Sequence, residues 1–594
     1  MPMRVARGLR VLPYAMLAGL VLVAYGAAVR NGYVWDDRYF LVDFAWLDSL
    51  QSALRTAFSP LFMSEAYVRP LPLLTLYVDS LFGEYRAAVS HGVNIALHVV
   101  STFLVFLLAQ DALRCMSKDG RASGRIALAA AALFAVHPAL SEAVIWVSSR
   151  FDLMATLFML VGLWVATRDA LSDRALASWL ALLFVASALS KELAVVFPAL
   201  LAALVVLRGA ARNGALGLGV LLEPRWRLAF AGIFAAGLFY LAIRLHVLQG
   251  ASGLSPVAFS QEQLVRVCAT IARYLQLTFV PFVGNAPQHT FVWTAQSAPG
   301  DYWLQIAVSV LYAVAVVGLL IRRHPLGWVL AAWSMCYLPV IHIIPINVGN
   351  NTVQQRFMYL PTATLLALAP YGVAGLSLSD AARRVVPVLL ALLLVASVLV
   401  VRSIVPAWAA DISLWSWARQ VDPASGMARE NLIWAYLERG MYAELDREVA
   451  LLREDGVVTS INAPLNVGVS YYHRGEIEQA LSYYEIAEAH VAEATPAQKS
   501  ALYANMASAY ALLSRYEDAA SSIEKAVGAD KSNHMALANL MAFCKPYDLD
   551  LSAFDEPVVR RAQEKKVQVL AVFRERRPDL DFSRLCPESL VAGR

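Results

Sequence analysis

Two adjacent carboxylates, Asp36 and Asp37, follow the first long apolar segment of the sequence, at the end of the string Tyr-Val-Trp-Asp-Asp. A carboxylate in this place can take a proton from an attacking hydroxyl. The pair can also hold a divalent cation through oxygen ligands, or stabilise a cationic transition state by negative charge. Because aspartate commonly caps helices and lies in solvated loops, a structural pair is the alternative interpretation.

Histidine and amide side chains recur in the next apolar segment. His91, Asn94 and His98 are spaced i, i+3 and i+7, which places them on one face of the expected helix. Such residues either contact a substrate or satisfy neighbouring polar groups inside a helical bundle, and their spacing leaves both interpretations open.

A third group, Glu142, Trp146 and Arg150, recurs every four residues and would project from one side of a helical loop. The planar guanidinium of Arg150 suits a phosphate, and an ion pair with Glu142 or Asp152 is the alternative. Further polar residues near the ends of apolar segments are Arg69, His137, Lys191, Arg356 and Tyr359.

The elements that must position these residues are membrane helices. Of the 594 residues, 59% are hydrophobic and 16% are charged, whereas soluble chains carry ~25% charged residues. With a mean hydropathy of +0.55, this predicts a polytopic membrane protein and excludes a large soluble enzyme or a disordered chain. The net charge of +4 includes no basic block, so we expect no nucleic acid partner. The five cysteines show no CxxC spacing, which argues against a structural zinc site.

Residues 1–404 form the expected membrane domain, an all-α bundle of about 11 transmembrane helices with ~20 residues each. The first is interpreted as an uncleaved helix, because no small-residue cleavage site follows it. Residues 264–283 are expected to form a re-entrant or interfacial helix that does not cross. The expected spans are 11–29, 89–113, 125–139, 151–167, 174–189, 193–208, 227–247, 302–321, 326–345, 357–378 and 385–404.

The distribution of charge predicts the orientation of these spans. With the N-terminus in the cytoplasm, the inner loops receive basic residues such as Arg208 and Arg322, and the outer loops receive Asp36 and Glu142. All the polar groups above then fall on the outer membrane face. Residues 405–594 lie on the same side, which in a bacterium is the periplasm.

The polar C-terminal part contains three related stretches that begin at Asn431, Asn466 and Asn505. Each has a tyrosine five residues later and a small residue nine residues later, as in tetratricopeptide repeats (TPRs). We therefore expect a soluble TPR solenoid of about three repeats over 405–545 and a helical tail over 546–594. The three asparagines are candidates for binding a peptide, and a structural spacer is the alternative. Cys544 and Cys586 could form a disulfide in an oxidising compartment.

The polar strings of residues 1–404 together resemble the transmembrane-and-TPR-containing (TMTC) family, whose second hallmark is the repeats. The family is similar to glycosyltransferases of the GT-C fold, which take a sugar from a polyprenyl phosphate outside the cytoplasm. Its eukaryotic members are protein O-mannosyltransferases, and we expect this chain to be a bacterial member in the inner membrane. The strings are Tyr-Val-Trp-Asp36-Asp37, Arg69-Pro70, Asn94-Ile-Ala-Leu-His98, His137-Pro138, Glu142-Ala-Val-Ile-Trp146, Arg150-Phe-Asp152, Lys191-Glu192 and Arg356-Phe-Met-Tyr359-Leu-Pro361.

The resemblance implies roles for the polar residues. Asp36 or Asp37 is the general base for an acceptor hydroxyl, and Glu142 helps to position the acceptor. A divalent cation, Mg²⁺ or Mn²⁺, held by the aspartate pair is the alternative, and no other cofactor is implied. The residues implied for the donor phosphate are Arg69, Arg150, Lys191 and Arg356, and those for further substrate contacts are His91, Asn94, His98, His137, Trp146 and Tyr359.

The predicted function is the transfer of mannose or a similar hexose from a polyprenyl-phosphate donor to a serine or threonine of an exported protein. The chemistry is expected to be inverting, and the repeats are expected to recruit the acceptor through Asn431, Asn466 and Asn505. The alternative is a non-enzymatic membrane scaffold for envelope or secretion assembly, in which the polar groups only tie helices together. Acidic and basic residues gathered on one membrane face favour the enzyme.

Overall fold

The computed structural model describes residues 2–42, 45–61, 67–116, 120–248, 260–293, 296–343, 351–373, 379–455, 461–545, 549 and 551–587. The chain divides into two compact units, Met1–Ser425 and Gly426–Arg594. The first unit extends beyond the expected boundary at residue 404, because η11 (Val405–Ala409) and α17 (Asp411–Val421) bond to the N-terminal segment. Asn31 Nδ2 donates to the Val405 carbonyl over 2.9 Å, and the Trp35 amide donates to Asp411 over 2.8 Å.

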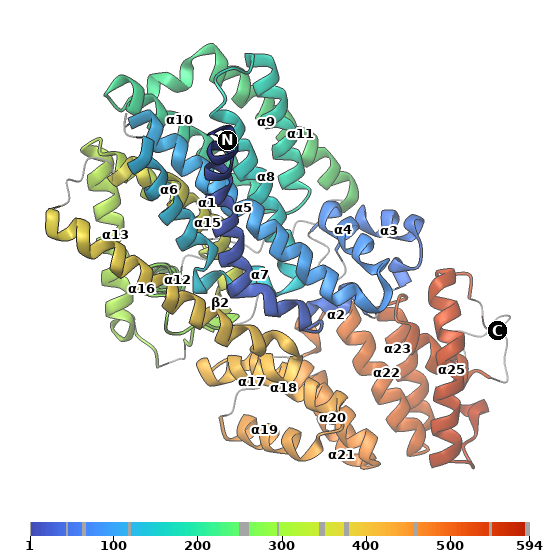
Figure 1. Ribbon diagram of the computed structural model, residues 1–594. Coiled ribbons are helices and arrows are strands. Elements are labelled where there is room, and N and C mark those ends of the chain that lie inside the picture. Colours follow the sequence, from blue (N-terminus) through green and yellow to red (C-terminus); the bar gives the residue numbers. More distant parts are fainter. Residues whose placement is uncertain are drawn as a thin grey trace. The chain divides into compact units, whose positions relative to one another are not determined.

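The expected membrane segments are largely helical over their described residues; the ends of two of them, 344–345 and 374–378, lie outside the described residues. In Figure 1, α5 runs through the first unit, where it packs against α6, α8 and α15. These helices are α1 (Pro2–Tyr25), α5 (Arg86–Met116), α6 (Gly120–Ala135), α8 (Arg150–Ala166), α9 (Asp173–Ala188), α10 (Phe197–Asn213), α11 (Pro224–Leu248), α13 (Trp303–Ile321), α14 (Pro325–Tyr337), α15 (Tyr359–Val373) and α16 (Asp380–Ile404).

Fewer of these helices qualify as spans than the sequence predicted. Within the described residues, seven helices are long and apolar enough to cross a membrane, or eight if the bent pair Gly124–Ala135 and Pro138–Ile145 is one span. The other three, α9, α14 and α15, have 16, 13 and 15 residues. At 1.5 Å per residue they are about 20–24 Å long, shorter than the ~30 Å hydrocarbon core. Judged by length and composition, the described helices therefore provide fewer than the 11 expected membrane spans.

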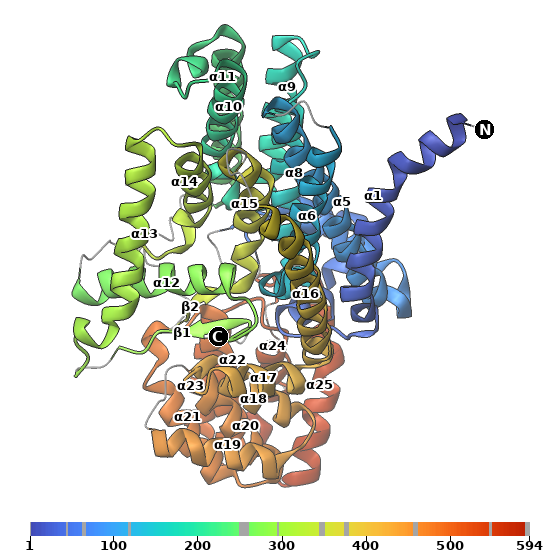
Figure 2. The ribbon, with the colours of Figure 1, turned by 60° about the vertical axis from the view of Figure 1, so that its left-hand side comes forward.

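Residues 264–283 belong largely to α12 (Gln261–Phe279), which is not among the candidate spans. In Figure 2, α12 runs across the direction of the neighbouring α13. Its apolar and polar residues lie on different faces, with Val265, Tyr274 and Leu277 buried. This is the arrangement expected of a helix that lies along the membrane surface.

Short elements connect the long helices of the first unit on the side that carries the polar strings. They are η1 (Gly26–Arg30), α2 (Asp36–Leu41), η2 (Ala45–Leu47), α3 (Leu50–Ala57), α4 (Pro70–Ser80), η3 (Gly83–Tyr85), η4 (Pro138–Leu140), α7 (Ser141–Ile145), η5 (Val147–Ser149), η6 (Glu192–Val196) and η10 (Gln355–Met358). The strands β1 (Gln288–Thr290) and β2 (Asn351–Gln354) form a small antiparallel sheet with Gln288 opposite Gln354. The fold is all-α in class, as predicted.

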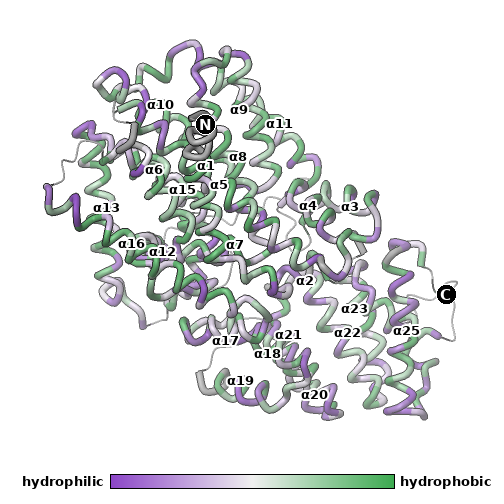
Figure 3. Tube along the Cα trace, in the orientation of Figure 1, coloured by the Kyte–Doolittle hydropathy of each residue, from purple (hydrophilic) through white to green (hydrophobic). Residues whose placement is uncertain are grey.

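The second unit consists of helical hairpins, and polar residues alternate with apolar ones along it, whereas the long helices of the first unit are mostly hydrophobic (Figure 3). The hairpins pair α18 (Gly426–Glu438) with α19 (Tyr442–Asp455), α20 (Asn462–Arg474) with α21 (Ile477–Glu488), α22 (Pro496–Leu512) with α23 (Tyr516–Ala529), and α24 (His534–Phe543) with α25 (Glu556–Arg576).

The turns inside the first three hairpins share one backbone conformation. Gly440, Gly475 and Ser514 all have positive φ, at 65°, 85° and 59°. Glycine adopts this conformation without the penalty that a Cβ causes, so Ser514 is the strained member of the series. The common turn supports the repeat spacing found in the sequence.

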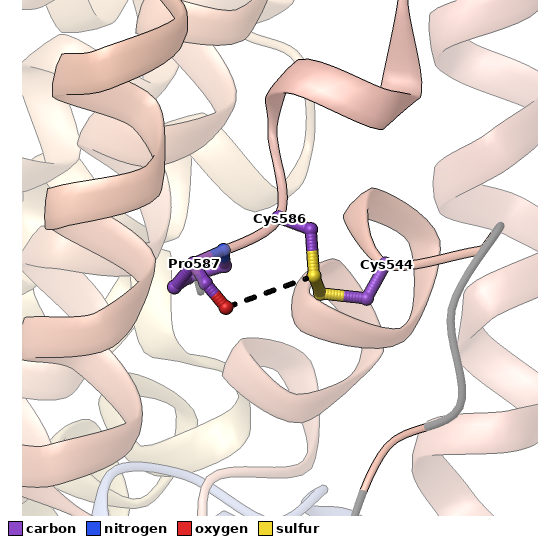
Figure 4. Close-up of a disulfide and its surroundings, with 3 residues drawn as sticks. All are labelled: Cys544, Cys586 and Pro587. Carbon is purple, nitrogen blue, oxygen red and sulfur yellow. Dashed lines mark hydrogen bonds between the residues drawn. A yellow bond between two sulfur atoms is a disulfide. The ribbon is translucent and has the colours of Figure 1, made fainter. Parts of the chain in front are cut away.

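A disulfide joins Cys544, after α24, to Cys586 in the C-terminal tail, as the sequence analysis had suggested (Figure 4). The Cα atoms of the two cysteines are 4.7 Å apart. Disulfides form and persist mainly in oxidising compartments.

Candidate active site

The neighbouring aspartates have different surroundings. Asp37 is fully buried, and its Oδ1 accepts hydrogen bonds from the Ser148 amide at 2.7 Å and the Ser148 hydroxyl at 2.5 Å. Its Oδ2 lies 3.4 Å from the Val34 amide nitrogen. Asp36 is half-buried, and among the described residues none donates a hydrogen bond to its carboxylate. Asp37 therefore ties α2 to η5, whereas Asp36 presents a carboxylate that is not engaged.

The two carboxyl groups also differ in acidity. Burial raises the pKa of Asp36 to about 6, and the positive charge of Arg356 opposes this rise. Burial raises the pKa of Asp37 to about 7, although its hydrogen bonds from Ser148 and Val34 favour the charged form. A carboxyl with a pKa near 6 is an effective general base close to neutral pH.

The aspartate pair is a poor fit for a divalent cation. Both oxygens of Asp37 already accept hydrogen bonds, which leaves Asp36 as the pair's one unengaged carboxylate. Within the described part of the chain, no group of three or more His, Cys, Asp or Glu side chains is arranged to hold a metal. A single carboxylate is too few protein ligands for a resident cation site, so no step is assigned to a metal here.

Glu142 and Arg356 form a linked pair between α7 and η10. The Arg356 Nη1 donates to Glu142 Oε1 over 2.7 Å, and the Arg356 amide donates to Oε2 over 2.9 Å. Glu142 is fully buried, whereas the Arg356 side chain remains 15% exposed. The guanidinium carbon also lies 5.0 Å from the centre of the Trp146 ring. Arg356 is thus anchored by one carboxylate while part of its guanidinium stays accessible beside Asp36.

Arg150 does not fit the predicted phosphate-binding role. Its side chain is fully buried and pairs with Asp79 over 2.6 Å. Its nitrogens also donate to the Asn94 amide oxygen at 2.9 Å, to the Thr75 hydroxyl at 3.2 Å and to the Ser90 carbonyl at 2.9 Å. Every guanidinium nitrogen is therefore used inside the protein. The alternative partners expected from the sequence, Glu142 and Asp152, bind other cations instead.

Lys191 and Arg69 lie in a second group of charges, which is more accessible than the pair of Arg150 and Asp79. Lys191 Nζ is 2.6 and 2.7 Å from the two oxygens of Asp152, and the Arg69 guanidinium donates twice to Glu192 Oε2, at 3.1 and 2.7 Å. The side chains of Lys191 and Arg69 are 11% and 13% exposed. Burial lowers the pKa of Lys191 to about 8, and the charges of Arg69 and Arg356 act in the same direction. Lys191, Arg69 and Arg356 are thus close enough to interact electrostatically.

Three of the predicted substrate contacts are used within the bundle. His98 bonds through one ring nitrogen to the Tyr359 hydroxyl at 2.9 Å and through the other to the Ala135 carbonyl at 3.1 Å. Asn94 donates to the Trp146 carbonyl at 3.0 Å and accepts from Arg150. All three side chains are fully buried, and their hydrogen bonds connect elements of the bundle, so their role in substrate binding stays a prediction.

The other three predicted substrate contacts are His91, His137 and Trp146, and each has a side-chain nitrogen without a hydrogen-bond partner among the described residues. Within the described residues, His91 Nδ1, His137 Nδ1 and Trp146 Nε1 are buried and have no hydrogen-bond partner. The second ring nitrogen of each histidine is 3.1–3.3 Å from a backbone carbonyl, that of Gly32 for His91 and that of Thr278 for His137. Their role in substrate binding stays a prediction.

An aromatic stack lies beside Asp36. Trp35 packs face to face on Trp146, with ring centres 4.5 Å apart, and Trp415 meets Trp35 edge-on. The backbone of Trp35 has a φ of 56°, a conformation that costs a residue with a Cβ about 1–3 kcal/mol. The hydrogen bond from its amide to Asp411 holds this conformation. Trp35 thereby begins α2 and directs Asp36 away from the core position that Asp37 occupies.

Parts of the chain match curated proteins. A stretch of 149 residues is 39% identical to protein O-mannosyl-transferase Tmtc1 of Drosophila melanogaster, and it covers 23% of this chain and 16% of that protein. A stretch of 169 residues is 28% identical to protein O-mannosyl-transferase TMTC3 of Homo sapiens, covering 27% and 17%. The chain resembles TMTC-type protein O-mannosyl-transferases.

A further match is protein O-mannosyl-transferase F38B6.6 of Caenorhabditis elegans, which is 27% identical over 185 residues, or 30% of this chain and 25% of that protein. The matched parts thus span between 16% and 25% of the relatives' own lengths. No protein-family model matches the chain.

Sequence reasoning missed three residues of the candidate site. Asp79 pairs with Arg150 and lies in the otherwise apolar helix α4. The sequence signal for it was a lone carboxylate in an apolar helix, because a buried charge needs a partner. Trp35 is part of the string Tyr-Val-Trp-Asp-Asp, but the sequence analysis assigned it no role of its own. Arg244 of α11 lies 3.6 Å from Glu192, and an arginine in a membrane helix was the signal for it.

The repeat asparagines have modest polar contacts. Asn431 and Asn505 each donate to a carbonyl four residues earlier in their own helix, at 2.8 and 3.0 Å. Asn466 and Asn505 are half-buried. These contacts leave the carbonyl oxygens of both amides available, and peptide binding by the helical repeats stays a prediction.

Proposed function

We propose that this protein is a membrane glycosyltransferase that moves a hexose from a polyprenyl-phosphate donor to a serine or threonine hydroxyl of an exported protein. Asp36 takes the hydroxyl proton, and the hydroxyl oxygen attacks the anomeric carbon of the sugar. The bond between that carbon and the phosphate oxygen breaks, and the polyprenyl phosphate leaves with the electron pair. A single displacement of this kind inverts the anomeric centre.

Lys191, Arg69 and Arg356 supply the positive charge that the leaving phosphate requires. Each is anchored by a carboxylate, so the three cations are held in place before the donor arrives. Arg150 takes no part in this step, because its nitrogens are bonded within the fold. Glu142 acts through Arg356 as a positioning residue.

The observation that carries the proposal is the unengaged carboxylate of Asp36 beside Arg356. Nearby carboxylates such as Asp37, Glu142 and Asp152 accept hydrogen bonds from protein groups. A half-buried carboxylate with a raised pKa that interacts with a partly exposed cation is a candidate for an acid–base site.

We further propose that the N-terminus lies in the cytoplasm and that Asp36 and the second unit lie on the outer side, the periplasm of a bacterium. The excess of basic residues in the opposite loops supports this orientation. The Cys544–Cys586 disulfide supports it independently, because it is stable in an oxidising compartment. In this location the helical repeats would recruit the protein acceptor.

The test is sugar transfer by the purified protein in detergent, with radiolabelled polyprenyl-phosphate mannose and an extract of exported proteins. Asp36→Asn is expected to lower transfer by about 10²–10⁴-fold while the protein remains folded. Glu84→Gln, which changes an exposed carboxylate on η3, is the matched control and should transfer like the wild type.

Label transfer that Asp36→Asn leaves intact would contradict the proposed base. A wild-type protein that transfers none of several hexoses, while its second unit captures assembly partners, would favour the scaffold.

A further inference from the structure

Glu192 is held between two arginines from different parts of the chain. Arg69 donates to its Oε2 from two nitrogens, and Arg244 Nη1 lies 3.6 Å from its Oε1. Oε1 is buried and accepts no hydrogen bond within the described residues. One side of this carboxylate is therefore bound closely and the other loosely.

Arg244 is in an unusual place for a charge. It lies four residues before the end of α11, a candidate membrane span. Few side chains of this helix are buried, and large apolar ones near Arg244, such as Phe239, Leu241 and Leu245, are exposed. A cation on such a helix is costly in lipid unless it is paired, which makes Arg244 a candidate for contact with a charged substrate.

The group as a whole suits an anion with two or more oxygens. Lys191 precedes Glu192 in the chain and interacts electrostatically with Arg69, so a third cation lies near the two arginines that contact this carboxylate. The side chains of Glu192 and Arg244 are 24% and 27% exposed, so the group is reachable from outside the protein. Guanidinium groups bind carboxylates and phosphates with the same paired hydrogen bonds.

We propose that Glu192 occupies the place of the donor's phosphate between Arg69 and Arg244, and that the phosphate of an isoprenoid lipid displaces it on binding. The lipid would enter from the membrane past α11, with its chain remaining among the exposed apolar side chains of that helix. This rests on the proposed function for the identity of the lipid. It adds Arg244 as a binding residue and Glu192 as an internal competitor.

The two residues are therefore expected to have opposite effects on binding. Arg244→Gln removes a phosphate ligand and should weaken binding of farnesyl phosphate by about tenfold, the loss of one charge-assisted contact. Glu192→Gln removes the competing charge and should strengthen binding by about threefold or more. A residue that only held the arginines in position would weaken binding when changed.

The experiment measures the affinity of the full chain in detergent for farnesyl phosphate by calorimetry, with farnesol and inorganic phosphate as comparison probes. Arg225→Gln is the matched control, because Arg225 lies in the first turn of the same helix and pairs with Asp173 at 3.0 Å. It should leave the affinity unchanged. Arg244→Lys, which keeps the charge, should retain part of the binding if Arg244→Gln proves unstable.

Weaker binding in both Glu192→Gln and Arg244→Gln would overturn the proposal, as would unchanged binding in Arg244→Gln. Because no sugar is transferred in this assay, its result is separate from that of the proposed function. Opposite effects without any glycosyl transfer would leave an isoprenoid-phosphate site in a protein of another function. If the protein transfers sugar but Glu192→Gln and Arg244→Gln change binding in the same direction, the proposed function would stand. The displacement of Glu192 by phosphate would then be excluded.

Discussion

Two groups of ion pairs on the same side of the first unit differ in one respect, which is access. Arg150 and Asp79 are almost completely buried, and each nitrogen of the arginine has a partner inside the protein. Arg69, Lys191 and Arg356 also pair with carboxylates, but 11–15% of each cationic side chain remains exposed. We expect the first group to stabilise the fold, and we propose that the second can exchange a carboxylate for a substrate anion.

The largest expected effect concerns the buried group. Arg150→Met leaves Asp79 as an uncompensated buried charge, which should cost about 3–5 kcal/mol of folding free energy. The double change Asp79→Asn with Arg150→Gln removes both charges and should recover part of that loss. The measurement is thermal unfolding in detergent. An Arg150→Met protein that unfolds like the wild type but no longer binds farnesyl phosphate would contradict the comparison.

In the accessible group we expect a smaller loss of folding free energy and a larger loss of substrate affinity. In Arg69→Gln, Glu192 keeps Arg244 as a partner and is partly exposed, so the loss of stability should stay within ~1 kcal/mol. The KM for the lipid donor should rise about tenfold, because one phosphate ligand is lost. Steady-state kinetics at varied donor concentration would measure this, and an unchanged KM would remove Arg69 from the site.

The smallest effect is on the pH dependence of kcat. Asp36 must be charged to accept a proton, so activity should be lost as the pH falls through about 6, its raised pKa. Lys191 must be charged to bind phosphate, so activity should also be lost as the pH rises through about 8. The profile should therefore be bell-shaped.

Two substitutions assign the limbs of this profile. Lys191→Arg should abolish the alkaline limb, because arginine stays protonated throughout this range. Arg356→Gln should move the acidic limb to higher pH, since Arg356 lowers the pKa of Asp36. If neither substitution moves its limb, Asp36 and Lys191 are not the groups whose titration sets the profile.

The sequence was sufficient to predict every long helix of the first unit, because long apolar runs leave few alternatives for the chain in a membrane. By length and composition the described helices give seven or eight candidate spans where the sequence predicted 11, since hydropathy does not fix where a short helix such as α14 ends. It also placed the domain boundary at residue 404, because the bonds of Asn31 and Trp35 to the segment 405–411 are long-range contacts.

The sequence drew attention to the charged residues of the candidate site, but it did not predict the contacts that distinguish them. Arg150 and Lys191 are both cations at the end of an apolar segment, and the pairing of Arg150 with Asp79 depends on tertiary packing. Asp36 and Asp37 are adjacent and identical in type. Which of them is buried depends on the backbone of Trp35, whose positive φ no sequence rule for tryptophan predicts.

The central claim is that of these two neighbours Asp36 acts in the chemistry and Asp37 in the fold. The most direct measurement compares glycosyl transfer by Asp36→Asn and Asp37→Asn, each normalised to its folded fraction from thermal unfolding. The account predicts that Asp36→Asn is stable and inactive, and that Asp37→Asn is destabilised but active per folded molecule. A stable, inactive Asp37→Asn beside an active Asp36→Asn would contradict it.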